Sequence, residues 1–255
     1  MTMSFHGPAL ETLHLEKRFG GLVATKDVTF QLAKGARHAL IGPNGAGKTT
    51  FVNQLSGVLA PSAGQIKLHG QDITRLRPDL RVKLGLARTF QINQLFKDLT
   101  PRETLGIAVA QRLGLGGRMW RSFMRDADIA AESAVLLQSF KLGDVADTRT
   151  ASLAYGKQRL LEIAVAIAAK PKVLLLDEPA AGVPEAERHE ILGVVKALPA
   201  DVAILLIEHD MDLVFAFADR ITVLVEGALL VDGTPAEIAA DARVKAVYLG
   251  SGEHG

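Results

Sequence analysis

The sequence has no cysteine among its 255 residues. Disulfides, thiolate catalysis and cysteine-ligated metals are therefore excluded. An excess of one charge is also missing, because 29 Lys and Arg face 28 Asp and Glu, a formal net charge of +1. Proteins that bind nucleic acid through a global positive field carry a clear basic excess, so we expect no nucleic-acid partner.

Long apolar runs are absent too. The strongest, residues 163–169 and 203–207, fall well short of the roughly 18 to 20 residues needed to cross a bilayer. Residues 1–9 have no apolar stretch of the kind that marks a secretory signal. We therefore expect any membrane contact to be made through a partner.

Apolar side chains are nevertheless plentiful, since 48% of the residues are hydrophobic and 22% are charged. That balance predicts a globular chain with one large core, or a core plus a subdomain. Alternating apolar residues in the first third predict β structure, and residues 37–41 predict a buried strand. A glycine-rich loop follows at once, and then a helix over residues 48–56 with Gly57 as its C-cap.

The middle and the last third differ in character. Residues 90–160 are predicted to be helical, and Thr100, Pro101 and Glu103 form a capping-box pattern. The last third alternates strand and helix, which predicts a mainly parallel sheet covered on both faces. Its predicted elements are strands at 173–176, 202–207 and 221–225, a helix at 185–198, a final hairpin, and a short helix that starts with the capping box at 234–237.

The glycine-rich loop carries the strongest chemical signal. Its glycines let backbone N–H groups converge on phosphate oxygens, while the following helix adds the positive end of its dipole. Lys48 would add a point charge and Thr49 a ligand for Mg²⁺. The loop reads Gly42-Pro43-Asn44-Gly45-Ala46-Gly47-Lys48-Thr49-Thr50.

Two adjacent carboxylates follow the apolar strand at 173–176. The carboxyl ends of strands in open α/β sheets are where ligands bind. Asp177 would hold Mg²⁺ through water, and Glu178 would orient and deprotonate an attacking water. Taken alone, the pair could also be an acidic pair that caps the next turn; beside a phosphate loop the catalytic interpretation is favoured.

His209 follows the strand at 203–207, so it is expected at the same sheet edge as Asp177 and Glu178. Gln91 lies where the core gives way to the helical segment, a suitable place for a hinge that senses Mg²⁺ or water. The other six histidines are interpreted as structural or solvated. Arg118, Arg121 and Arg125, interleaved with aromatic residues and methionines, fit either a solvated helix face or contact with a membrane partner or lipid headgroups.

With these motifs in place, the chain resembles the nucleotide-binding subunits of ATP-binding cassette (ABC) transporters over nearly its whole length. The loop at 42–49 matches the Walker A motif, residues 174–178 the Walker B strand, Gln91 the Q-loop and His209 the switch histidine. Residues 153–158 occupy the place of the signature motif. Phe19 occupies the place of the aromatic residue that stacks on adenine.

The resemblance implies an α/β fold: a RecA-like P-loop NTPase core with an N-terminal antiparallel β subdomain and an inserted α-helical subdomain. We expect the core with its β subdomain at residues 1–89 and 161–233, the helical subdomain at 90–160, and a C-terminal helix and tail at 234–255. The resemblance also implies that ATP and Mg²⁺ are the cofactors. ATP would lie between the Walker A loop of one subunit and Ala154, Tyr155 and Gly156 of another, so hydrolysis would need a dimer.

Within the family the resemblance is closest to the LivG-like branch, which imports branched-chain and related amino acids. The stretches that carry it are residues 18–21, 87–91, 153–156, 178–182 and 247–250. The resemblance implies two transmembrane permeases, a LivF-like ATPase or a second copy of this chain, and indirectly a periplasmic binding protein. It also implies a peripheral position on the cytoplasmic face of the inner membrane.

Four positions depart from the wider family pattern: Ala154, Tyr155, Lys157 and Pro184. The LivG-like branch shares the Ala-Tyr-Gly pattern, so we interpret it as a feature of that lineage and not as a loss of function. Ala154 lacks the hydroxyl that serine would offer to the phosphate across the dimer, a loss of about 0.5 to 1.5 kcal/mol. Pro184 stands where Asn or Asp is usual, which would weaken communication between the two ATP sites. The alternatives are a soluble cassette ATPase that acts on nucleic acid or ribosomes, and a regulatory module that does not hydrolyse ATP; the retention of Glu178 and His209 disfavours the second.

Overall fold

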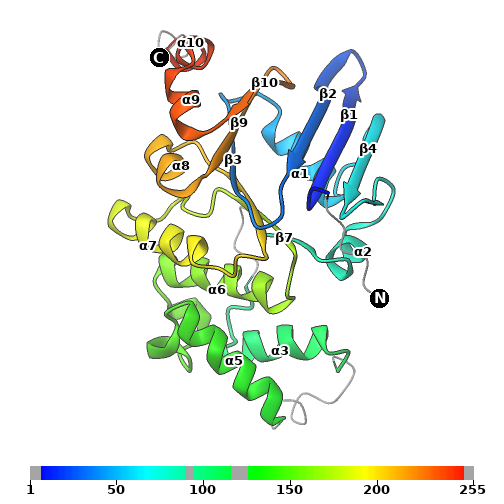
Figure 1. Cartoon of the computed structure of the whole chain (residues 1–255). Coiled ribbons are helices and arrows are strands. Elements are labelled where there is room, and N and C mark those ends of the chain that lie inside the picture. The colour runs from blue at the N-terminus through cyan, green and yellow to red at the C-terminus, as the bar shows by residue number, and fades with distance from the viewer. Residues whose placement is uncertain (1–6, 90–94, 116–125, 250–255) are drawn as a thin grey trace. The chain divides into compact units, whose positions relative to one another are not determined.

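The computed structural model describes residues 7–89, 95–115 and 126–249, and it divides into two compact units (Figure 1). The first unit contains residues 1–88, 172–178 and 199–255, and the second contains residues 89–171 and 179–198. None of the helices within the described residues has the length and apolarity that spanning a bilayer requires.

The first unit holds two sheets. One is antiparallel, with strand order β2-β1-β4-β5; the other has the order β10-β9-β3-β8-β7-β6 and is parallel except for its β9–β10 hairpin. The strands are β1 Leu10–Phe19, β2 Leu22–Leu32, β3 Arg37–Ile41, β4 Ala63–Leu68, β5 Gln71–Asp72, β6 Leu86–Arg88, β7 Val173–Asp177, β8 Ala203–Ile207, β9 Arg220–Val225 and β10 Ala228–Gly233.

The core of this unit joins both sheets through α1. Phe51, Val52 and Leu55 on α1 are fully buried in one cluster with residues of β1, β2, β3, β7 and β8. Strands β3, β7 and β8 are buried along their whole length, as expected of central parallel strands covered on both faces. The helices of the unit are α1 Lys48–Ser56, α2 Pro78–Lys83, α8 Met211–Phe217, α9 Pro235–Ala240 and α10 Ala242–Leu249.

The second unit is helical. Helix α3 Pro101–Arg112 packs on α5 Ala127–Ser139 and on α6 Tyr155–Ala168, which in turn packs on α7 Glu185–Lys196. The predicted capping box is present, since Thr100 accepts from the backbone N–H of Glu103 and the Glu103 side chain returns to the Thr100 N–H. The same arrangement at Thr234 and Glu237 begins α9 in the first unit.

The two units differ in extent from the predicted domains. Helix α6 is continuous, so the boundary expected after residue 160 falls inside it. Residues 179–198, expected in the core, belong to the helical unit because α7 packs on α6. The predicted C-terminal part is not separate either: α9 packs against β9 and β10 and groups with the first unit.

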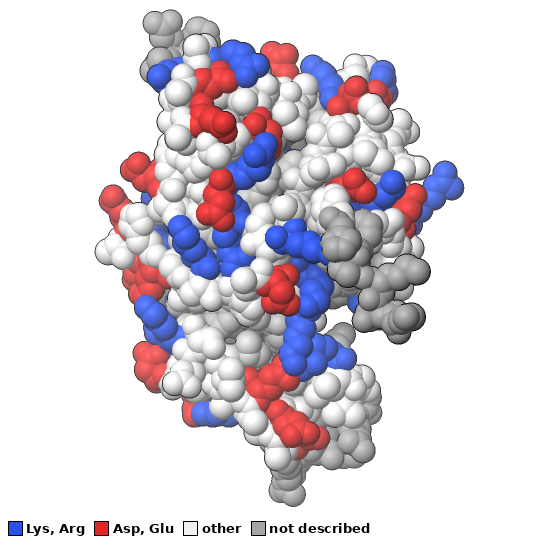
Figure 2. Space-filling model, in the orientation of Figure 1, with Lys and Arg blue, Asp and Glu red and all other residues white. Residues whose placement is uncertain are grey.

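Charge is mixed on the surface. On the face in Figure 2, side chains of both signs are scattered over the molecule with uncharged residues between them. That pattern agrees with a formal net charge of +1.

Candidate functional site

The glycine-rich loop connects β3 to α1, as predicted. Gly47 stands at the N-cap of α1 in the left-handed conformation, with φ at 97°, and no side chain caps the helix. The first N–H groups of α1 are therefore left for a ligand, and the positive end of the helix dipole lies at the same place. An anion, above all a phosphate, is the ligand that this arrangement favours.

Two glycines in the loop cannot be replaced without moving the backbone. A Cβ at Gly42 would lie 2.1 Å from the carbonyl oxygen of Leu224, and one at Gly47 would lie 2.5 Å from that of Ala24. Both residues also have positive φ, +152° and +97°. The loop is thus held closely between β2 and β9, which explains why glycine is needed at these two positions.

Lys48 lies over its own loop. Its Nζ donates to the carbonyl oxygens of Gly42, at 2.5 Å, and Pro43, at 3.1 Å. Burial lowers the pKa of Lys48, whereas the negative charges of Glu178 and Asp177 raise it. The ammonium group is therefore placed at the loop and within electrostatic reach of both acids.

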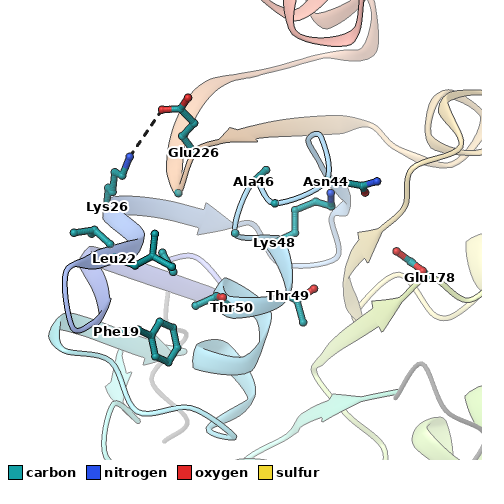
Figure 3. Close-up of a pocket in the computed structure, with 15 residues that line it drawn as sticks. Phe19, Leu22, Lys26, Asn44, Ala46, Lys48, Thr49, Thr50, Glu178 and Glu226 are labelled. Carbon is teal, nitrogen blue, oxygen red and sulfur yellow. Dashed lines mark ion pairs between the residues drawn. The ribbon is translucent and has the colours of Figure 1, made fainter. Parts of the chain in front are cut away.

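A cavity of 610 Å³ opens beside the loop. In Figure 3 the loop and the start of α1 lie between Phe19 and Leu22 on one side and Glu178 on the other. Phe19 ends β1 and is 48% exposed, with Lys17 Nζ 5.1 Å from the centre of its ring. The residues that line the cavity are Phe19, Leu22, Val23, Ala24, Lys26, Asn44, Gly45, Ala46, Gly47, Lys48, Thr49, Thr50, Glu178, Glu226 and Gly227.

The two acids lie at the carboxyl end of β7. Asp177 is 2% exposed, whereas the Glu178 side chain is 27% exposed and faces the cavity. The backbone N–H of Glu178 donates to the carbonyl of Ile207 at the end of β8. Glu178 has φ of +46°, an uncommon value for a residue other than glycine.

The structure brings His209 to Glu178. Strands β7 and β8 are parallel neighbours, so their carboxyl ends meet at one sheet edge. His209 Nδ1 lies 3.8 Å from Glu178 Oε1 and 3.8 Å from Glu208 Oε2. The His209 side chain is 65% exposed, whereas that of Glu208 is only 2% exposed. His209 can thus reach a ligand beside Glu178, as its position after β8 predicted.

Ala154, Tyr155 and Gly156 lie in the second unit at the start of α6. Ala154 is the N-cap and makes no side-chain cap hydrogen bond, so the first N–H groups of α6 are also left for a ligand. Tyr155 is 39% exposed. A Cβ at Gly156 would lie 2.2 Å from Glu187 Oε2, so glycine lets the α7 carboxylate come close to the α6 N-terminus.

Some lining residues were not predicted from the sequence. Leu22, Val23 and Lys26 come from β2, and Glu226 and Gly227 from the turn between β9 and β10. Backbone hydrogen bonds bring both segments to the loop: Lys26 N–H donates to Gly227, and Gly227 N–H donates to Ala46. No local pattern marks such residues. Gln91 and Arg118 to Arg125 lie outside the described residues.

The donors at this site suit magnesium bound together with phosphate. Over the part of the chain that the structure describes, no group of three or more His, Cys, Asp or Glu side chains could hold a metal without other ligands. Thr49 lines the cavity, and the Asp177 carboxylate ends β7 directly before Glu178, which lines it too. Mg²⁺ commonly takes one or two protein oxygens and completes its shell with water and substrate phosphates.

Comparison with known proteins agrees with these features. The family model described as ABC transporter matches residues 25–181, and one described as branched-chain amino acid ATP-binding cassette transporter matches residues 228–254. The chain is 40% identical over 250 residues to the high-affinity branched-chain amino acid transport ATP-binding protein BraF of Pseudomonas aeruginosa, covering 95% of this chain and 98% of BraF. It has the same identity and coverage with the corresponding protein LivG of Escherichia coli.

Solved structures give the same result. A nucleotide-free ATP-binding cassette from an ABC transporter aligns with a TM-score of 0.82 at 28% identity, covering 94% of this chain and 98% of that one. An ATP-binding cassette in its ADP conformation aligns with a TM-score of 0.83 at 29% identity, covering 95% and 98%. This chain therefore belongs to the family of ABC transporter ATP-binding subunits, in the branch that contains LivG and BraF.

Proposed function

We propose that this chain is the Mg²⁺-dependent ATPase subunit of an importer for branched-chain or related amino acids. The observation that carries the proposal is the cavity in which Lys48, at the phosphate loop, and Glu178, at the end of β7, line the same space. One wall offers positive charge and backbone N–H groups, and the other offers a carboxylate. Together they suit the attack of water on a bound phosphate.

In this proposal the phosphate loop binds the triphosphate. Backbone N–H groups of the loop and of the first turn of α1 donate to phosphate oxygens, and Lys48 neutralises their charge. Thr49 and Asp177 would hold Mg²⁺, the latter through water. The metal would neutralise charge on the phosphates.

Glu178 is proposed as the general base. It would take a proton from water as the water oxygen bonds to the γ-phosphorus and the bond to the bridging oxygen of ADP breaks. His209, 3.8 Å from the Glu178 carboxylate, would hold the water and the γ-phosphate in line. Gln91 is assigned to the same task and to Mg²⁺ by family resemblance, and it lies outside the described residues.

The nucleoside end would lie against the apolar part of the cavity. Phe19, Leu22 and Val23 line it, and the half-exposed ring of Phe19 offers a face on which adenine can stack. The remaining phosphate donors would come from a second ATPase subunit, through the N-terminus of its α6 at the positions of Ala154, Tyr155 and Gly156. That subunit would be a LivF-like chain or a second copy of this one.

The transported molecule is inferred from relatives. BraF, LivG and the probable LivG of Archaeoglobus fulgidus, the last at 36% identity, are named as branched-chain amino acid transport ATP-binding proteins. The match at residues 228–254 to a model of the same description adds to this inference. We therefore assign two permeases and, indirectly, a periplasmic binding protein as partners, and a position on the cytoplasmic face of the inner membrane.

Co-purification tests the assignment to an importer. A tagged copy expressed in its native host should, after gentle solubilisation of membranes, carry with it two permeases and a second cassette subunit that mass spectrometry identifies. A tagged chain expressed in a host that lacks these permeases serves as the control for adventitious binding. Recovery of the chain with ribosomal or DNA-bound proteins alone would contradict transport and favour a soluble cassette ATPase.

A further inference from the structure

Arg88, at the end of β6, makes a buried ion pair with the proposed metal-binding acid. Its Nη2 donates to Asp177 Oδ2 at 2.7 Å, and the two side chains are only 8% and 3% exposed. Strands β6 and β7 are parallel neighbours, with Arg88 opposite Leu175. The pair is therefore buried at the carboxyl ends of β6 and β7, the sheet edge at which the candidate site lies.

Arg88 is also held from the phosphate-loop helix. Its Nη1 donates to Asn53 Oδ1 at 2.6 Å and to Ser56 Oγ at 3.1 Å, both on α1. The guanidinium group is planar and keeps its charge. The two contacts from α1 therefore fix its orientation, so that Nη2 is held against Asp177 Oδ2. Arg88 thus joins the strand that carries the acid to the helix that begins at the phosphates.

Asp177 ends β7 and directly precedes Glu178, which lines the cavity, so its charge lies close to the candidate phosphate site. A triphosphate bound at the phosphate loop would be repelled by an unneutralised carboxylate beside the cavity. Salt screens such a buried charge much less than one at the surface. Something must therefore neutralise Asp177 whenever nucleotide is bound without a divalent cation.

We propose that Arg88 is a resident counter-charge for Asp177, a positioning residue that lets the site take a nucleoside triphosphate before Mg²⁺ arrives. Once Mg²⁺ is bound, the metal supplies most of that neutralisation, and Arg88 then mainly holds Asp177 in place. The inference rests on the proposed function, because it assumes that Asp177 serves a metal-bound nucleotide.

The test is a titration of the full-length chain with the non-hydrolysable analogue AMPPNP, once in Mg²⁺ and once in EDTA. Arg88→Met should lower the affinity in EDTA by about tenfold to thirtyfold, because one buried charge is left unneutralised. In Mg²⁺ the loss should be clearly smaller. Arg88→Lys keeps the charge and should retain most of the affinity in EDTA. Arg77→Met removes an arginine from an exposed pair with Asp79 and serves as the matched control.

A double variant separates charge from packing. Removing both partners of a buried pair is far less disruptive than removing one, so Arg88→Met with Asp177→Asn should fold and should recover the wild-type affinity in EDTA. If Arg88 only supports the fold, Arg88→Met would lose affinity equally in both buffers and the double variant would not recover it. Either of those two results overturns the proposal.

The single variant Asp177→Asn tests the same inference without changing Arg88, so it can be used if Arg88→Met fails to fold. It leaves the positive charge of Arg88 without its carboxylate, so AMPPNP should bind more tightly in EDTA than it does to the wild type. Unchanged or weaker binding would contradict the inference. If the wild-type chain bound no AMPPNP even in Mg²⁺, the proposed function itself would be overturned. If the wild type bound AMPPNP and Arg88→Met bound it with the wild-type affinity in both buffers, only the role of Arg88 would be overturned.

Discussion

Replacement of Glu178 by Gln is expected to lower ATP turnover by about 10²- to 10⁴-fold while ATP still binds. The amide keeps the size of the side chain but cannot take a proton from water. Glu178 faces the cavity, and its backbone is fixed by the N–H bond to Ile207, so the substitution should leave the site in place. Phosphate release by the assembled complex measures turnover, and a fluorescent ATP analogue measures binding.

Glu226→Gln is the matched control for this experiment. Glu226 is a second carboxylate on the same cavity, and it lies 4.0 Å from Lys26 rather than beside His209. Its side chain is 86% exposed, so its loss should change turnover little. If Glu178→Gln turned over ATP at the wild-type rate in the complex, Glu178 would not be the general base.

Replacement of Lys48 by Ala should mainly reduce nucleotide affinity. A hydrogen bond to a charged group contributes about 1.5 to 3 kcal/mol, which corresponds to a loss of about tenfold to 150-fold. The negative charge of Glu178, which lines the same cavity, would then face the triphosphate without this ammonium group. Equilibrium titration with ATP and Mg²⁺ would measure the loss.

Two controls show whether a loss of affinity in Lys48→Ala comes from the missing ammonium group. Lys67→Ala, on β4 and away from the cavity lining, should bind ATP as the wild type does. Because Lys48 Nζ donates to two carbonyls of its own loop, the melting temperature without nucleotide reports whether the loop has relaxed. A variant that kept full affinity would place the phosphates somewhere other than this loop.

The sequence predicted the parts of the site that depend on local structure. Strand, glycine loop and helix at residues 37–56 follow from an apolar run, from glycines and from a C-cap at Gly57, all within about 20 residues, and the structure has them at those positions. The meeting of Glu178 and His209 was also expected, because adjacent parallel strands place their carboxyl ends at one edge. Local signals and one rule of sheet geometry were sufficient here.

Other parts of the site depend on tertiary contacts. The turn at Gly227 reaches the phosphate loop only because β9 pairs with β3 and a backbone bond joins Lys26 to Gly227. The short strand β6 was not predicted, because three residues give no periodic pattern, and its Arg88 could not be connected with Asp177, 89 positions away. The helical unit also includes α7, beyond the predicted residues 90–160, because α7 packs on α6, and that packing is not visible in either segment alone.

The most direct test of the whole account is amino-acid uptake by the co-purified complex in proteoliposomes. ATP and Mg²⁺ would be supplied on the side of the membrane that carries the cassettes, and the binding protein on the opposite side. Radiolabelled leucine, isoleucine or valine would be added with the binding protein, and its arrival on the cassette side would be measured. Uptake is expected to require ATP and to be abolished by Glu178→Gln in this chain. Uptake that continues with Glu178→Gln, or ATP hydrolysis that moves none of these amino acids, would contradict it.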